Sequence, residues 1–297
     1  MRSRTIARRT FLGSVAAPLA AFGASDEDVL ASVHAMEARE KLTILTDADA
    51  MWHRWRGARN QGSMSVSTAV SPDGKALCWG KEDPRETSPF LTVSSIRSGV
   101  KPIRLEGWWV GGYVISSGPD VIVAVAHLGA DRGRTAKLLA FDLRSGLAVQ
   151  DLTSMMPLGG PSSISGSGAL VGFGTEDQFE VREIPSGDTV FKGRGSYPRL
   201  SPDGDRLAFI RDDRLFIRSL DDGSTKEFLA GTTVKGAAGW SPDGRYLLAG
   251  AWTRSLSSRK WLVALDTTSG RYAEMSALGE GDFGTHLQWI SVELMTR

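Results

Sequence analysis

The sequence contains little of what covalent or metal-dependent catalysis requires. Among 297 residues there are four histidines and a single cysteine, Cys78. One cysteine excludes an internal disulfide and any zinc site built from cysteine pairs. No histidine is followed by Glu, as the zinc metalloprotease motif requires, and no Gly-x-Ser-x-Gly nucleophile elbow occurs. We therefore expect a protein without catalytic residues, bound metal or cofactor.

Neither sign of charge predominates, and long hydrophobic runs are absent. The 35 basic and 34 acidic residues give a net charge of +1, which does not favour nucleic-acid binding. The apolar stretch from Phe11 to Ala21 is interrupted by Gly13, Ser14 and Pro18. It is too short and too weakly apolar to form a stable membrane-spanning helix. We therefore expect no transmembrane span in the mature protein.

Residues 1–24 predict an export signal. A basic segment without acids precedes the apolar stretch, and small residues follow it up to Ala24, which is the order of regions in a signal peptide. The segment Arg8-Arg9-Thr10-Phe11-Leu12 resembles the twin-arginine signal, which implies export of an already folded protein. General secretion and a retained anchor are the alternatives. Cleavage after Ala24 would leave 31 basic and 34 acidic residues, in a periplasmic or secreted protein.

A four-residue motif, Ser-Pro-Asp-Gly, occurs three times. Ser at the first position, Pro at the second and Gly at the fourth favour a type I turn closed by a left-handed glycine. An apolar, strand-like run follows each copy, so each motif predicts a hairpin. We assign all twelve residues to structural turns, with calcium binding by the aspartates as the alternative. They are Ser71, Pro72, Asp73, Gly74, Ser201, Pro202, Asp203, Gly204, Ser241, Pro242, Asp243 and Gly244.

The spacing of these turns indicates a repeat. Ser71 and Ser201 are 130 residues apart, and Ser201 and Ser241 are 40 apart. Degenerate copies stand near Ser116 and Ser165, and Trp289-Ile290-Ser291 resembles the start of another. The mean step is about 44 residues, the period of a four-stranded propeller blade.

The repeat predicts an all-β fold, a single six-bladed β-propeller over residues 41–297. Five units are complete. The sixth combines two strands from the C-terminus, over 286–289 and 291–295, with a third strand over 41–46 and an outer strand over 51–55. Strands from both termini would thus close the ring and leave only short outer edges exposed.

A short helix is predicted over residues 25–40. Ser25 is a suitable cap and acidic residues occupy the first turn. Val29, Leu30, Val33 and Met36 fall on one face. This face indicates a helix packed on the propeller or a linker. The alternative is a helix that covers one mouth of the central channel or docks on a partner.

The Ser-Pro-Asp-Gly turns, with glycine-containing turns between later strands, resemble the WD40-like repeat of TolB-type proteins. The same repeat occurs in propeller domains of prolyl oligopeptidase relatives. The resemblance covers residues 41–297 and implies a propeller. TolB proteins carry an α/β domain before their propeller, whereas only residues 25–40 separate the predicted signal from the repeats here.

Candidate binding residues gather where one blade connects to the next. Trp108 and Trp109 lie on such a connection, and Tyr197 and His286 align at the start of inner strands, with Arg199 two residues beyond Tyr197. These connections surround one mouth of the channel, where exposed aromatic residues favour partner binding. We therefore expect a monomeric, non-enzymatic module that recruits a protein or peptide in the cell envelope. The alternatives are an accessory propeller that controls access to a partner hydrolase, and a lyase or hydrolase with its site at the channel mouth.

Overall fold

The structure is a computed structural model that describes residues 26–45, 68–81, 90–95, 103–106, 108–115, 121–128, 136–142, 148–155, 161–165, 167–174, 177–184, 186–252, 260–277 and 288–296. These residues are mostly in antiparallel β-sheets. Helices are few: α1 (Glu27–Glu40), the 3-10 turn η1 (Thr153–Met155) and α3 (Val292–Thr296).

Five sheets each contain four strands that are consecutive along the chain and antiparallel. The first contains β2 (Thr68–Val70), β3 (Ala76–Lys81), β4 (Phe90–Ser95) and β5 (Ile103–Glu106). The second contains β6 (Trp108–Ile115), β7 (Val121–Leu128), β8 (Ala136–Asp142) and β9 (Ala148–Asp151). The third contains β10 (Pro161–Ile164), β11 (Leu170–Gly174), β12 (Gln178–Glu183) and β13 (Thr189–Arg194). The fourth contains β14 (Ser196–Leu200), β15 (Arg206–Arg211), β16 (Arg214–Ser219) and β17 (Thr225–Phe228). The fifth contains β18 (Thr233–Trp240), β19 (Tyr246–Trp252), β20 (Lys260–Asp266) and β21 (Tyr272–Ala277).

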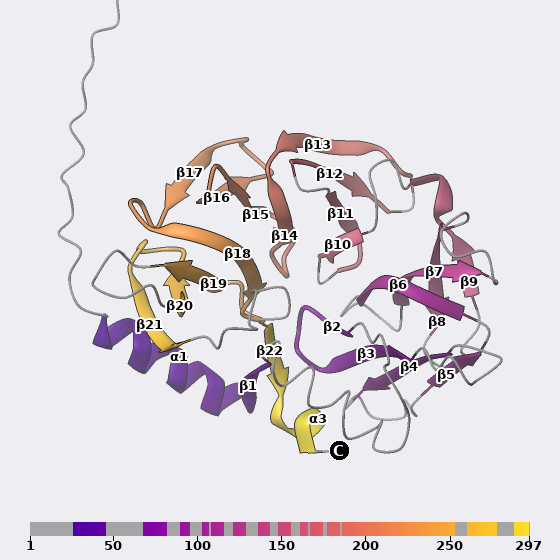
Figure 1. Cartoon of the computed structure of the whole chain (residues 1–297), viewed down its shortest axis with the longest axis horizontal. Coiled ribbons are helices and arrows are strands. Elements are labelled where there is room, and N and C mark those ends of the chain that lie inside the picture. The colour runs from indigo at the N-terminus through magenta and orange to yellow at the C-terminus, as the bar shows by residue number, and fades with distance from the viewer. Residues whose placement is uncertain are drawn as a thin grey trace, which may run out of the picture.

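A sixth, two-stranded sheet joins distant parts of the chain. Its strands are β1 (Leu42–Leu45) and β22 (Gln288–Ser291), paired antiparallel with Leu42 opposite Ser291. The sheets are arranged around a common centre, and the first strand of each complete sheet lies nearest to it (Figure 1). Each of these inner strands contacts the next in the order β2, β6, β10, β14, β18, β22, and β22 contacts β2.

The sixth sheet differs from the sequence prediction in two respects. The predicted strand over 291–295 is wrong, because the chain turns into α3 after Ser291, whose hydroxyl accepts a hydrogen bond from the Glu293 N–H at 3.3 Å. The strand near residue 42 was predicted as the third strand, but it pairs directly with β22 and so occupies the second position. The predicted outer strand over 51–55 lies outside the described residues.

Helix α1 packs on the fifth and sixth sheets through its apolar face. Its cap is Asp26 rather than the predicted Ser25: the Asp26 carboxylate accepts hydrogen bonds from the N–H groups of Asp28 and Val29, each at 3.1 Å. Val29, Val33 and Met36 are buried in one cluster with residues of β1, β19, β20, β21 and β22. The helix lies along the periphery of the ring (Figure 1), so it does not cover the centre.

The three Ser-Pro-Asp-Gly segments form nearly identical turns. In each, the glycine N–H donates to the serine carbonyl at 2.8–2.9 Å, and the serine hydroxyl donates to the aspartate carboxylate. The same hydroxyl accepts a hydrogen bond from the N–H five residues further on. The glycine φ angles are 70°, 87° and 71°, a region that favours glycine. The degenerate copy at Ser165 forms the same turn, with Ser167 in the place of the aspartate.

Aromatic side chains link the third and fourth sheets. Phe191, Phe179, Phe209 and Phe216 form a chain of ring contacts with centroid distances of 5.8, 4.8 and 5.6 Å. The guanidinium of Arg218 lies 4.2 Å from the Phe191 ring centroid at one end. At the other end, the Arg211 guanidinium lies 4.4 Å from the Phe216 centroid. The aromatic chain thus packs adjacent sheets face to face, and cations cover both of its ends.

Candidate functional site: the inner-strand rim

The first candidate site lies at the end of the fourth sheet where its inner strand begins. Three segments meet there: Ser196–Tyr197 at the start of β14, the hairpin Arg211–Arg214, and the connection Leu229–Val234. Ser196 pairs with Ile210, next to the hairpin, and the Val234 N–H donates to the Asp213 carbonyl at 2.9 Å. We call the surface formed by these three segments the inner-strand rim.

Tyr197 leaves the regular strand at this rim. Its φ is 53°, and 38% of its surface is exposed. The register of β14 against β15 shifts between Ser196 and Arg199. Gly195 precedes this bulge at a φ of 136°, where a Cβ would overlap the Ile210 carbonyl oxygen. The local sequence thus holds a large aromatic residue outward at the start of an inner strand.

Arg199 faces away from the third sheet. Its neighbours Pro198 and Leu200 are buried. Pro198 packs over Gly174 of β11, and Leu200 belongs to the cluster around Phe179. Because side chains alternate along a strand, Arg199 is directed to the opposite face, where β18 is the neighbouring inner strand.

The Arg199 guanidinium is in a poorly solvated environment. Burial lowers its pKa to about 10, although the nearby Tyr197 raises it. The residue as a whole is intermediate between buried and exposed. Its backbone carbonyl accepts a hydrogen bond from the Trp240 indole at 2.9 Å, which ties β14 to the fifth sheet.

Unusual backbone angles gather at the inner-strand rim. Of the five non-glycine residues with positive φ among the described residues, four belong to it: Tyr197, Asp212, Asp213 and Leu229. The aspartates form a two-residue hairpin turn that tolerates such angles. Tyr197 and Leu229 are bulky residues for which these angles are true outliers, each costing about 1–3 kcal/mol. Strain of this kind clusters at functional sites.

An ion pair that sequence reasoning missed joins the rim to the next residue of β18. The Lys235 ammonium is 2.6 Å from the Asp213 carboxylate, and both side chains are about half exposed. The same ammonium lies 5.9 Å from the Trp252 ring centroid. The Asp212-Asp213 pair between two apolar runs was a hairpin signal in the sequence, but its pairing with Lys235 depends on contact between two sheets.

The structure describes only part of the predicted site. It brings Tyr197 and Arg199 together on β14. Trp108 and Trp109 begin the inner strand β6, but their side chains lie outside the described part of the chain. His286 lies outside it entirely. The grouping of these three residues with Tyr197 therefore stays a prediction.

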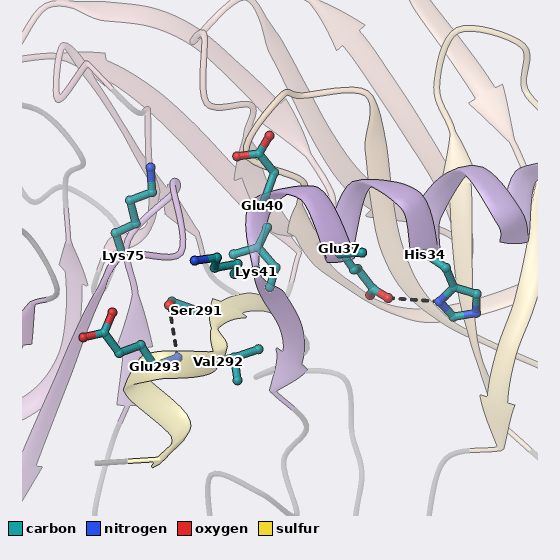
Figure 2. A pocket seen from close by; sticks show the side chains of 10 residues that line it. His34, Glu37, Glu40, Lys41, Lys75, Ser291, Val292 and Glu293 are labelled. Atoms are coloured by element: carbon teal, nitrogen blue, oxygen red, sulfur yellow. Dashed lines mark hydrogen bonds and ion pairs between the residues drawn. The ribbon is translucent and has the colours of Figure 1, made fainter.

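A second candidate is a pocket of about 930 Å³ on the opposite side, between the end of α1, β1, the first turn and α3. Figure 2 shows charges of both signs around it: the cations are Lys75 and Lys41, and the anions are Glu40 and Glu293. Glu37 in its wall is already engaged, because its carboxylate accepts from the Trp289 indole at 2.9 Å and contacts the His34 ring at 3.1 Å. This carboxylate serves to hold α1 on the sixth sheet.

The described residues contain neither a candidate metal centre nor a membrane-spanning helix. Within those ranges, no group of three or more His, Cys, Asp or Glu side chains is placed to hold a metal ion. Nor does any helix there have the length and apolar character needed to cross a membrane.

Comparison with known proteins shows the fold. The sequence matches no protein-family model and no curated protein. Among solved structures, the chain is similar to TolB from Acinetobacter baumannii, with a TM-score of 0.52 and 15% identity over 76% of this chain and 57% of that one. It also resembles an oligogalacturonate lyase from Vibrio parahaemolyticus (TM-score 0.49, 11% identity, 74% and 75% coverage). A third similar structure is the β-propeller domain of the Trilobed protease from Pyrococcus furiosus (0.46, 9%, 73% and 72%).

The likeness to TolB bears on the fold. Together with the antiparallel sheets around a common centre, the TolB comparison identifies the fold as a β-propeller. The chain spans little more than half of the TolB chain. At this level of identity the likeness concerns the fold alone, because one fold carries many functions.

Proposed function

We propose that this chain is an exported, monomeric, non-enzymatic β-propeller of six blades that recruits a protein or peptide partner. Its binding surface is the channel mouth at the inner-strand rim. Trp108, Trp109, Tyr197, Arg199 and His286 supply the contacts, and the twin-arginine-like segment directs the chain to the periplasm or the exterior.

Two observations support a closed ring of six blades. The inner strands contact one another in an unbroken cycle that returns from β22 to β2. The pairing of β1 with β22 joins the N-terminal part of the chain to its C-terminal part by sheet hydrogen bonds. Such closure leaves only short, protected strand edges.

One observation carries the choice of binding surface: the strained, exposed Tyr197 beside the poorly solvated Arg199. Both features cost stability, and among the described residues no other inner strand has a non-glycine residue at positive φ. Aromatic and arginine side chains on a rigid scaffold are among the residues that most often dominate binding energy. Their position at the inner-strand rim therefore favours partner binding there.

The test is affinity capture from the cell envelope with the chain lacking residues 1–24. Trp108→Ala combined with Tyr197→Ala should leave the melting temperature unchanged and weaken partner capture by at least about 1 kcal/mol. The matched control is Lys75→Ala combined with Arg245→Ala beside the turns on the opposite side. If the control variant loses capture and the rim variant keeps it, the partner binds on the side of the turns and the proposal is refuted.

A further inference from the structure

The first turn of α1 is held by a group of ionic and polar contacts, which we call the N-terminal clamp. Its members are Asp26, Asp28 and Arg271, together with the backbone of Tyr272. Nε of Arg271 contacts the Asp26 carboxylate, and Nη2 lies 3.3 Å from the Asp28 carboxylate. The Asp26 N–H donates to the Tyr272 carbonyl oxygen at 3.3 Å. The start of the helix is thus fixed to the start of β21, in addition to the cap that Asp26 forms.

The blade itself does not require a cation at the position of Arg271. This residue follows the turn between the third and fourth strands of the fifth sheet, where its carbonyl accepts from the Asp266 N–H at 2.9 Å. The same hydrogen bond, at the same distance, identifies Asp188 in the third sheet and Ser224 in the fourth sheet as its equivalents. Neither of these residues is a cation. The guanidinium of Arg271 therefore serves the helix that packs on the fifth sheet rather than the sheet itself.

The apolar anchoring of α1 is separate from the clamp. Its buried residues are Val29, Val33 and Met36, and Glu37 holds the far end of the helix through the Trp289 indole at 2.9 Å. The clamp acts on the residues before Val29, at the end of the helix, where fraying begins. Its contacts therefore oppose local opening of the first turn.

Local opening decides where a folded chain can be hydrolysed. A peptidase binds its substrate as an extended segment, so a bond within α1 is cleaved only while the surrounding turn is open. The cleavage rate then follows the population of the open form. A bond before Asp26 lies outside the clamped turn, so its hydrolysis leaves the contacts of the clamp in place.

We propose that the N-terminal clamp sets the limit of proteolytic processing, so that a peptidase removes residues before Asp26 from the folded chain and leaves α1 intact. Hydrolysis adds one water molecule across the cleaved bond and yields a carboxylate on the released segment and a new amino terminus on the protein. Arg271 is the residue that protects the helix, because it holds both carboxylates of the clamp. The inference goes beyond the proposed function, since it concerns neither the partner nor the route of export.

The experiment is limited digestion of the native full chain by thermolysin, a peptidase that cleaves before bulky apolar residues. Phe22 provides such a site in the predicted leader, and Val29 and Leu30 provide two sites just beyond the clamp. New amino termini are labelled at successive times and quantified by mass spectrometry, so that cleavage elsewhere in the chain does not interfere. The variants are Arg271→Gln, Arg271→Lys and Arg214→Gln.

The matched control is Arg214→Gln. Arg214 is 61% exposed and lies 3.5 Å from the Glu227 carboxylate in the fourth sheet, and the side chain of Arg271 is 54% exposed. Each variant therefore removes one positive charge and one ion-paired surface arginine.

We expect the wild type and the control to be cleaved before Phe22 well before the bonds preceding Val29 and Leu30 are cut. In Arg271→Gln, cleavage at those two bonds should be at least about threefold faster, a modest factor because exposed ion pairs are weak. Arg271→Lys should lie between the two, since an ammonium lacks the separate N–H groups that reach both carboxylates. The melting temperatures of Arg271→Gln and Arg214→Gln should agree, because the clamp opposes local rather than global unfolding.

Three results would overturn the inference. One is an equal rate of cleavage before Val29 and Leu30 in Arg271→Gln and Arg214→Gln. Another is cleavage of the wild type before Leu30 as fast as before Phe22, which would mean that the clamp gives no protection. The third is an increase in Arg271→Gln that is equally large at sites throughout the chain, which would make Arg271 a residue of global stability. None of these results bears on partner capture at the inner-strand rim, so the proposed function stands or fails separately.

Discussion

Replacing Met36 with alanine tests whether α1 belongs to the folded unit of the propeller. Met36 is 2% exposed and lies in the cluster that joins α1 to the fifth and sixth sheets. Truncating a buried methionine costs about 2–5 kcal/mol, because apolar contacts are lost and a cavity remains. At roughly 2–4 °C per kcal/mol for a domain of this order of size, a loss of about 3 kcal/mol lowers the melting temperature by roughly 6–12 °C.

The matched control is His34→Ala on the exposed face of the same helix. Its side chain is 60% exposed and contacts only Glu37 among the interactions described, so its loss should cost less than about 1 kcal/mol. Unfolding in urea, followed by tryptophan fluorescence and by circular dichroism, compares both variants with the wild type. A single coincident transition is expected, since α1 and the sheets share one core.

Equal stability of Met36→Ala and His34→Ala would refute this reasoning. It would mean that α1 makes no stabilising contact and acts as a linker. A biphasic transition, in which α1 melts first, would contradict the view that the helix is part of the cooperative unit.

Three further predictions concern the turns, a buried carboxylate and the N-terminal segment. Gly204→Val places a β-branched residue at a φ of 87° and should lower stability by about 1–3 kcal/mol in urea unfolding, more than Asp203→Ala does. Glu180 is fully buried and accepts hydrogen bonds from Thr189, Arg182 and Lys192, which lower its pKa although desolvation raises it. Its contribution to stability is thus present above the pKa of an unfolded glutamate and is lost as the pH falls through the lower folded pKa, so Glu180→Gln should flatten the acid limb of a stability–pH profile. Arg8→Lys combined with Arg9→Lys should abolish export, measured by cell fractionation, whereas an unchanged distribution would rule out the twin-arginine route.

Much of the blade structure was predictable because the signal is local. A Ser-Pro-Asp-Gly segment specifies its turn through hydrogen bonds within six residues, and glycine marks the left-handed position. The repeat period then predicts the approximate position of each strand along the chain. The same locality made the copy at Ser165 recognisable despite two replaced residues, because the serine and glycine that close the turn are retained.

The sixth sheet was predicted less well because its partners are distant in sequence. Ser291 and Glu293 are a local signal for the start of a helix, but the repeat pattern favoured a strand there. The contact between the Lys41 carbonyl and the Val292 N–H, at 3.0 Å, joins distant parts of the chain and leaves no local pattern. The direct pairing of β1 with β22 likewise depends on how the two ends meet. The ion pair of Lys235 and Asp213 joins two sheets and left no pattern at repeat spacing.

A repeat protein offers its own internal reference for function. Each blade packs against its neighbours in the same way, so residues that recur at one position in the blades indicate a structural requirement of the fold. A residue that breaks the pattern at a cost in stability reports something else, and Tyr197 and Arg199 do this two positions apart on one inner strand. One deviation of this kind can be accidental drift within a scaffold that tolerates it. Two that share an inner strand and combine an aromatic surface with a cation form a chemically coherent pair, and for this reason we propose the binding surface at this end of β14 rather than at the uniform turns.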